Sequence, residues 1–318
     1  MDLELRDQIV EEINKWIDPK NNDRSANKLA EKSGVNAAYI SRIRNGEYSF
    51  VSSNGRVSSI SDVHFFRLAE AIGMKLGDEF KWEMLASYKQ AYKLFRKSQR
   101  KQLRACLDGD SGQGKTFAQK WYGRENDYVV HVECTRNLTP RGLINLLCDK
   151  LGIDLPASRS PYERLEIIKK AITNRRGYVL LFDQVGKNEV KPSIYGVLMD
   201  IAVAIEGKAG MVVCGYKISE MLTYMYEQHQ PGYRQLARRF IHNRYELPGL
   251  QPGEIASVCE SEGISNKGAQ NIFKQYVTDV DQLVQWVRDV RDWQRENNAL
   301  ITGEQVIAMF NVKSLMAA

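Results

Sequence analysis

The residues best suited to chemistry are eight consecutive ones, Gly109, Asp110, Ser111, Gly112, Gln113, Gly114, Lys115 and Thr116. They fit the pattern Gly-x-x-x-x-Gly-Lys-Thr at every specified position. The glycines let backbone N–H groups turn inward around phosphates at the start of a helix. We expect Lys115 to reach the outer phosphates and the Thr116 hydroxyl to bind Mg²⁺. The sequence therefore predicts a phosphate loop for ATP with Mg²⁺, although no motif separates adenine from guanine.

A second candidate stands at the end of an apolar segment, 178–182, which Asp183 follows directly. A carboxylate at the end of a buried strand downstream of a phosphate loop is placed to hold Mg²⁺ through its water shell. The next residue is Gln184, where a catalytic glutamate is more usual. Because an amide orients water but is a poor base, we expect an ATPase whose hydrolysis is slow or depends on Glu133 or on a partner.

The elements that must position these residues follow an alternating pattern. Apolar segments predict strands at 103–107, 128–134, 178–182 and 210–214, and the segments between them predict helices at 116–124, 140–151, 161–173 and 192–206. Such alternation indicates a parallel sheet with helices on both faces. After residue 248 the pattern predicts helices alone, at 253–262, 266–277, 280–297 and 303–311.

The N-terminal part predicts an all-helical domain. Its helices are expected at 3–16, 25–32 and 36–45, where Gly46 ends the third, and a fourth is expected after a Ser61-Asp62 cap. The Ser- and Gly-rich segment 49–59 is expected to be a loop, and 81–97 a helix that leads into the first strand. We therefore expect domains at 1–75 and 101–248, joined by a helical linker at 76–100, and a helical lid at 249–318.

Composition favours an anionic partner, since the net charge is +6 and the sequence pI is about 8.9. Basic residues gather ahead of the phosphate loop, where a partner surface and a solvated helix face are equally good interpretations: Lys89, Lys93, Arg96, Lys97, Arg100, Lys101 and Arg104. The five scattered cysteines are expected to be buried, reduced thiols. No run of about 18 apolar residues or signal-peptide pattern occurs, so we expect a cytoplasmic protein without a membrane partner.

Residues 85–312 resemble an AAA+ ATPase in the order of helical lead-in, phosphate loop, Asp183 strand, later strand, arginine-bearing segment and helical lid. The resemblance implies a polar sensor after 210–214, where Tyr216 and Lys217 stand in place of the usual Asn or Thr. It also implies an arginine that reaches the next subunit's nucleotide, for which Arg238 and Arg239 are the candidates. The second sensor arginine is missing from the lid helix, and Gln282 lies near its expected position.

Residues 26–46 resemble a helix-turn-helix of the phage-repressor type. Ala30 allows the two helices to approach, and Gly34 makes the turn between them. The resemblance implies DNA contact by the polar side of the second helix, above all by Tyr39, Arg42 and Arg44. Because some such modules bind only proteins, protein contact remains an alternative.

The combination of these two parts in a chain of 318 residues is similar to the phage Mu B-like family of transposition target-selection proteins. The resemblance implies subunits that self-associate on double-stranded DNA as a ring or helical filament and recruit or stimulate a transposase in DNA integration. Basic residues after two strands would then follow the DNA backbone: Arg136, Arg141, Lys187 and Lys191. Two alternatives are a nucleotide-gated transcription regulator that reads an operator and a helicase-loading ATPase of phage replication. A metabolic P-loop kinase fits less well, because it has no evident use for the lid and the paired arginines.

Overall fold

The centre of the molecule is a five-stranded parallel sheet. The computed structural model describes residues 3–18, 22–51, 57–60, 62–74, 80, 84–153, 160–174, 177–187, 189–227 and 233–311. The strand order is β4-β5-β6-β3-β7, with every neighbouring pair parallel. The strands are β3 (Arg104–Asp108), β4 (Val129–Glu133), β5 (Val179–Asp183), β6 (Gly210–Gly215) and β7 (Arg244–Glu246). The predicted parallel sheet is thus confirmed.

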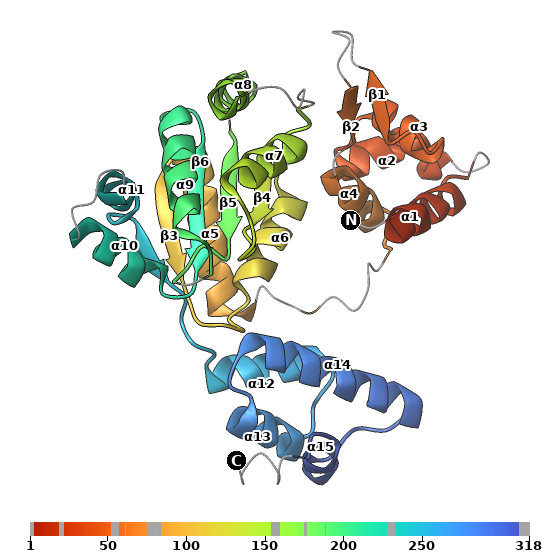
Figure 1. Ribbon diagram of the computed structural model, residues 1–318. Coiled ribbons are helices and arrows are strands. Elements are labelled where there is room, and N and C mark those ends of the chain that lie inside the picture. Colours follow the sequence, from red (N-terminus) through yellow and green to blue (C-terminus); the bar gives the residue numbers. More distant parts are fainter. Residues whose placement is uncertain are drawn as a thin grey trace.

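Helices cover both faces of this sheet (Figure 1). On β5 the side chains of Val179 and Leu181 enter one core, and those of Leu180 and Phe182 enter the other. Because both faces are buried, β5 is apolar from Val179 to Phe182. The first face packs on α5 (Ala86–Lys101) and α6 (Lys115–Glu125), and the second on α7 (Pro140–Lys150), α8 (Pro161–Thr173), α9 (Pro192–Ala204), α10 (Ile218–Glu227) and α11 (Tyr233–Phe240).

Three elements of the core, α10, α11 and β7, were not among the helices and strands predicted from the sequence. The helix α10 buries Ile218, Leu222 and Met225, whose spacing of four and three residues is a helical signal. The strand β7 has only three residues and lies at the sheet edge with exposed ends, so it carries no period-two pattern. The helix expected at 81–97 is observed as α5, which extends to Lys101, while residues 81–83 lie outside the described part.

Arg104 does not belong to the basic cluster in which its sequence position placed it. It is the first residue of β3 and is only 8% exposed. Its guanidinium donates hydrogen bonds to the carbonyls of Gln102 (2.9 Å) and Ala202 (2.8 Å). Arg104 therefore ties β3 to the end of α9 and is not a surface cation.

The N-terminal domain has a separate core, made by residues such as Ile9, Leu29, Ile40 and Phe65. Its helices are α1 (Leu3–Trp16), α2 (Ala26–Ser33), α3 (Ala37–Arg44) and α4 (Asp62–Ala71), with a short 3₁₀ turn, η1 (Asn22–Arg24). The expectation of helices and loop alone was wrong for 49–59, because β1 (Ser49–Val51) and β2 (Val57–Ser59) pair as an antiparallel hairpin. The proposed cap residue Ser61 lies outside the described residues.

This domain contacts the core through α4 and the end of α6. The guanidinium of Arg67 lies 3.4 Å from the Asp127 carboxylate. The guanidinium of Arg124 lies over the Phe66 ring, 4.4 Å from its centre. The contact thus joins the N-terminal domain to the helix that begins with the phosphate-loop lysine.

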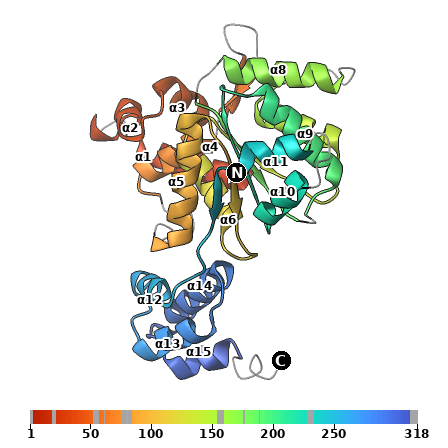
Figure 2. The same ribbon diagram turned by 90° about the vertical axis from the view of Figure 1, so that its left-hand side faces the viewer.

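The C-terminal residues form a small helical group beside the end of the sheet at which the strands finish and the phosphate loop lies (Figures 1 and 2). It comprises α12 (Pro252–Ser261), α13 (Lys267–Tyr276), α14 (Val280–Asn297) and α15 (Gly303–Met309), and is called the lid below. Trp286 packs between Phe273, whose ring meets it edge-on, and Phe310, which stacks on it at 4.1 Å. The predicted all-helical pattern after residue 248 is confirmed.

Candidate nucleotide site

The phosphate loop joins the end of β3 to the start of α6. Gly112 and Gly114 adopt left-handed backbone angles, with φ of 79° and 78°, which favour glycine at both positions. The Lys115 ammonium donates hydrogen bonds to the carbonyls of Gly109 (2.6 Å) and Asp110 (2.7 Å). Lys115 is therefore held over the loop, where phosphate oxygens can replace the carbonyls as its acceptors.

Side chains within and before the loop fix its shape. The Gln113 side-chain oxygen accepts a hydrogen bond from the Asp110 N–H at 3.0 Å. A Cβ atom at Gly109 would lie 2.5 Å from the same oxygen, so a larger residue there would displace the Gln113 side chain. The Asp108 carboxylate accepts from the N–H groups of Gly109 (2.9 Å) and Ser219 (3.0 Å). Asp108, which the sequence reasoning missed, thereby joins the loop to the start of α10.

The predicted magnesium ligands lie together. The Thr116 hydroxyl donates a hydrogen bond of 2.5 Å to the Asp183 carboxylate, which is 1% exposed. Burial by itself raises the pKa of Asp183, but the nearby His131 ring and the Thr116 hydroxyl outweigh it, so the pKa lies below its usual value. His131 Nε2 lies 3.9 Å from the Asp183 carboxylate, too far for a hydrogen bond, and is a buried atom without a hydrogen-bond partner. An ionised carboxylate beside a hydroxyl is a donor set that suits Mg²⁺.

Gln184 is held in an unusual backbone conformation next to this pair. Its φ of 57° is left-handed, which is uncommon for a residue other than glycine. Its side-chain amide donates a hydrogen bond of 3.1 Å to the Glu133 carboxylate. Because Glu133 lies opposite Asp183 in the register of β4 and β5, the amide and a carboxylate meet at the edge of the sheet.

Glu189 is a further residue that the sequence reasoning missed. Its carboxylate accepts hydrogen bonds from the N–H groups of Gly186 and Tyr216, and so joins the segments that follow β5 and β6. Burial raises the pKa of Glu189. Its sequence context, a loop after Asp183, gave no signal for this role, because both hydrogen-bond donors are backbone groups.

The expected sensor residues at the end of β6 are occupied by local contacts. Tyr216 is 39% exposed and its N–H is bound to Glu189. The Lys217 ammonium lies 3.4 Å from the Glu220 carboxylate and 5.6 Å from the Tyr216 ring centre. In the lid, the Gln282 side chain accepts a hydrogen bond of 2.8 Å from the N–H of Thr278, the residue before the N-cap of α14.

The lid contacts the phosphate loop directly, through what we call the lid contact. The N–H groups of Val280 and Asp281, at the start of α14, both donate to the Gly112 carbonyl at 3.0 Å. The Asp279 side chain caps α14 by accepting from the Gln282 N–H and lies against Gly112, where a Cβ atom would come within 2.7 Å of it. Burial and the neighbouring Asp279 raise the pKa of Asp281. The lid contact is a second reason for glycine at position 112.

The two candidate arginines of α11 differ in their surroundings. Arg238 is exposed. The side chain of Arg239 is 28% exposed, and its guanidinium lies 3.5 Å from the Glu206 carboxylate and contacts the Met199 sulfur at 3.9 Å. Of the two, Arg238 lacks the Glu206 contact and extends from α11 into solvent, whereas Arg239 fastens α11 to α9.

The candidate DNA residues of the N-terminal domain lie on α3, which follows α2 after a turn with Gly34 at a φ of 68°. Tyr39 packs against the His64 ring at 5.1 Å. Arg42 lies 3.4 Å from the Glu47 carboxylate, and the Arg44 guanidinium donates to the Asn14 side chain at 2.8 Å. DNA contact by either arginine would have to replace these contacts.

The remaining candidates lie beyond the ends of β4 and β5: Arg136 and Lys187 in loops, Arg141 in the first turn of α7 and Lys191 at the N-cap of α9. Arg136 and Arg141 follow β4, and Lys187 and Lys191 follow β5; all four are exposed. Because all strands of the sheet are parallel, the segments that follow β4 and β5 lie at the same C-terminal ends of the strands as the phosphate loop. The structure thus brings these four residues to one edge.

Comparisons with known proteins support the fold. No protein-family model and no curated protein matches the chain. Among solved structures, the Aeropyrum pernix Orc1 protein in complex with DNA has a TM-score of 0.51 and 15% identity, covering 73% of this chain and 66% of the Orc1 chain. Cdc6p from Pyrobaculum aerophilum has a TM-score of 0.51 and 15% identity, covering 72% and 66%. Domain III of the Thermotoga maritima replication initiation protein DnaA has a TM-score of 0.50 and 13% identity, covering 74% and 98%.

The chain therefore spans slightly less than two thirds of the Orc1 and Cdc6p chains and nearly all of the DnaA domain. At these identities the likeness concerns the fold. No helix in the described part of the chain is long and apolar enough to cross a membrane. The five-stranded parallel sheet, its covering helices and the phosphate loop after β3 have the fold of an AAA+ ATPase core.

Proposed function

We propose that the protein is an ATP-dependent DNA-binding ATPase that assembles on duplex DNA, selects it as a target and recruits or stimulates a transposase. The observation that carries the nucleotide part is the contact of Thr116 with the buried Asp183 carboxylate beside Lys115. Thr116 and Asp183 would hold Mg²⁺, directly and through its water shell respectively. Mg²⁺, when bound, supplies positive charge to the phosphates. Lys115 binds the outer phosphates by exchanging its two carbonyl acceptors for phosphate oxygens.

Hydrolysis needs a base and an ordered water. We assign the base to Glu133, since its carboxylate lies 3.1 Å from the Gln184 amide and Gln184 itself cannot accept a proton at neutral pH. The hydrogen bond between them orients both side chains at the edge of the sheet. A base on β4 in place of the residue after Asp183 accounts for the slow, partner-dependent turnover that we expect.

Assembly would complete the site. Arg238 is exposed on α11 and lacks the Glu206 contact of Arg239, so Arg238 is the residue that we assign to the neighbouring subunit's nucleotide. An arginine supplied in trans stabilises the charge on the phosphates during transfer. ATP binding and self-association would then depend on each other, as a ring or filament requires.

DNA is the polymer on which assembly would occur. The net charge of +6 and the exposed cations after β4 and β5 favour a phosphate backbone, and α3 offers a second contact. A structural neighbour, the Aeropyrum pernix Orc1 protein, is itself in complex with DNA. We infer a transposase as the partner because the order of N-terminal helical domain, phosphate-loop core and lid resembles that of transposition target selectors.

Electron microscopy of the protein on long duplex DNA tests this proposal, with and without a non-hydrolysable ATP analogue. Filaments or rings that form on DNA only with the analogue, and not in Lys115→Ala, are the expected result. Discrete particles at one site, indifferent to nucleotide, would contradict target selection and favour a transcription regulator. The likeness to DnaA domain III favours replication as the second candidate, which predicts assemblies on single-stranded DNA or with a helicase in place of a transposase.

A further inference from the structure

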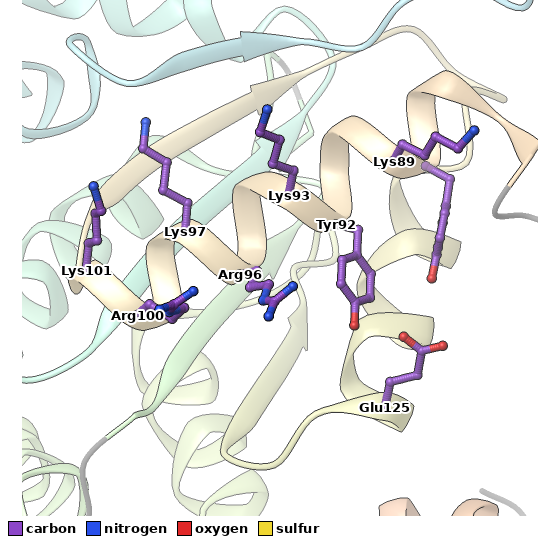
Figure 3. A pocket seen from close by; sticks show the side chains of 9 residues that line it. Lys89, Tyr92, Lys93, Arg96, Lys97, Arg100, Lys101 and Glu125 are labelled. Atoms are coloured by element: carbon purple, nitrogen blue, oxygen red, sulfur yellow. The ribbon is translucent and has the colours of Figure 1, made fainter.

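One face of α5 carries a dense set of cations along a surface groove with a volume of about 800 Å³ (Figure 3). The lysines recur every four residues and the two arginines form a neighbouring row, so that one side of the helix is basic along its length. The six cations are Lys89, Lys93, Arg96, Lys97, Arg100 and Lys101. From residue 89 to residue 101 the helix rises roughly 18 Å.

The cations of this face have no acidic partners in the described chain. The sixteen residues of α5 include no Asp or Glu, and no described carboxylate forms an ion pair with any of the six. Lys97 donates to the Tyr245 hydroxyl at 2.7 Å, a neutral partner. A solvated helix face ordinarily alternates charges, because like charges four residues apart destabilise a helix. Within the described chain no carboxylate relieves the repulsion between these cations, so a bound anion would stabilise this face of the helix.

The same groove argues against stacked single-stranded bases. Its aromatic residues are Tyr88, which is 8% exposed, and Tyr92, which packs edge-on against Tyr122 at 4.9 Å. Single-strand sites present open aromatic faces for base stacking, whereas these rings are engaged in the core. Glu125 is the one acidic residue that lines the groove, and it lies at one end, beside Tyr92 (Figure 3).

We propose that the basic face of α5 binds the phosphate backbone of duplex DNA without reading its sequence. This inference rests on the proposed function and adds a surface to it, separate from α3 and from the loops after β4 and β5. A straight row of cations spaced at helical turns fits a regular line of phosphates. The Lys89 end lies near the lid, since the Ala86 N–H at the start of α5 donates to the Glu254 carboxylate of α12.

The test is the salt dependence of duplex binding by the full chain with ATP analogue. The variant Lys93→Ala/Arg96→Ala/Arg100→Ala removes three exposed charges from α5. The control Lys150→Ala/Lys170→Ala/Lys208→Ala removes three exposed charges from α7, α8 and the turn before β6, none of them on α5. Each lost phosphate contact lowers the log–log slope by roughly 0.9, so we expect a decrease of about 2.7 in the α5 variant and none in the control.

The outcomes separate this inference from the proposed function. If the wild-type protein shows no nucleotide-dependent DNA binding, the proposed function fails. If it binds and both variants keep the wild-type slope, or if only single-stranded binding changes, the α5 inference fails alone. A second measurement needs no variant: duplex DNA should protect Lys89, Lys93, Lys97 and Lys101 of the wild-type protein from acetylation while leaving Lys150, Lys170 and Lys208 reactive. Equal labelling of α5 with and without DNA would overturn the assignment.

Discussion

The lid contact makes a quantitative prediction for Gly112→Ala. The new Cβ would lie 2.7 Å from the Asp279 Oδ1 atom, 2.8 Å from Cγ and 3.0 Å from Cβ. Asp279 cannot turn away freely, because the same Oδ1 accepts from the Gln282 N–H at 2.9 Å and so caps α14. Moving it would lose a helix cap, which is typically worth about 1 kcal/mol. A second cost lies in the loop, since φ at residue 112 is 79° and a left-handed alanine costs about 1–2 kcal/mol.

The strain in the loop and the clash with Asp279 should affect two different measurements. The loop cost opposes the backbone shape that cradles phosphates, so we expect nucleotide affinity to fall by roughly 5- to 30-fold. The clash opposes the lid contact, so the Val280 and Asp281 amides should lose roughly fivefold in hydrogen-exchange protection. The amide of Val287, in the middle of α14, is the internal control and should keep its protection.

Asp279→Gly is the matched background for this test, because it removes all three clashing atoms. Glycine at a helix N-cap costs only a few tenths of a kcal/mol, so the single variant should be mild. In that background Gly112→Ala should still weaken nucleotide binding but should no longer reduce protection of Val280 and Asp281. Additive losses in both observables would refute the reasoning, since no clash with Asp279 would then exist.

Three further predictions concern the chemistry. Lys115→Ala should abolish nucleotide-dependent DNA binding with unchanged circular dichroism, and an unchanged DNA affinity would contradict the proposed coupling. Gln184→Glu should raise ATP turnover about tenfold or more by adding a base, and Glu133→Gln should lower it; a phosphate-release assay checks both, and unaltered turnover in Glu133→Gln would exclude Glu133 as the base. Arg238→Ala should reduce turnover of the assembled protein about 10³-fold, whereas Arg239→Ala should chiefly lower the melting temperature; the reverse pattern would exchange their roles.

The parts of this molecule that could be predicted from the sequence are those whose residues lie close together in one segment. The phosphate loop, the Asp183 strand and most helices follow from spacing within one segment, and the pairing of Thr116 with Asp183 follows from the known geometry of such loops. Contacts made by backbone groups were not predictable in this way. Glu189 binds two N–H groups and Gly112 accepts two from the lid, and no side-chain pattern records either contact.

The surroundings of charged residues were also not predictable from sequence position alone. Arg104 and Lys101 are three residues apart, yet one caps carbonyls in the interior and the other is exposed in the α5 groove. Arg238 and Arg239 are adjacent, and only the second pairs with a carboxylate, that of Glu206 just after α9. A count of basic residues cannot separate such neighbours, because the partner that buries one of them is about 30 to 100 residues away in the chain.

The chain order places the proposed DNA surfaces on the two sides of the phosphate loop. α5 is followed after two residues by β3, whose last residue, Asp108, holds the first N–H of the loop. On the other side, α6 begins at Lys115 and ends beneath the N-terminal domain, where Arg124 meets Phe66. An anion bound on α5 is thus separated from the phosphate loop by β3, and DNA bound by α3 is separated from it by α4 and α6. Linkage then requires that DNA tighten ATP binding by the same factor by which ATP tightens DNA binding.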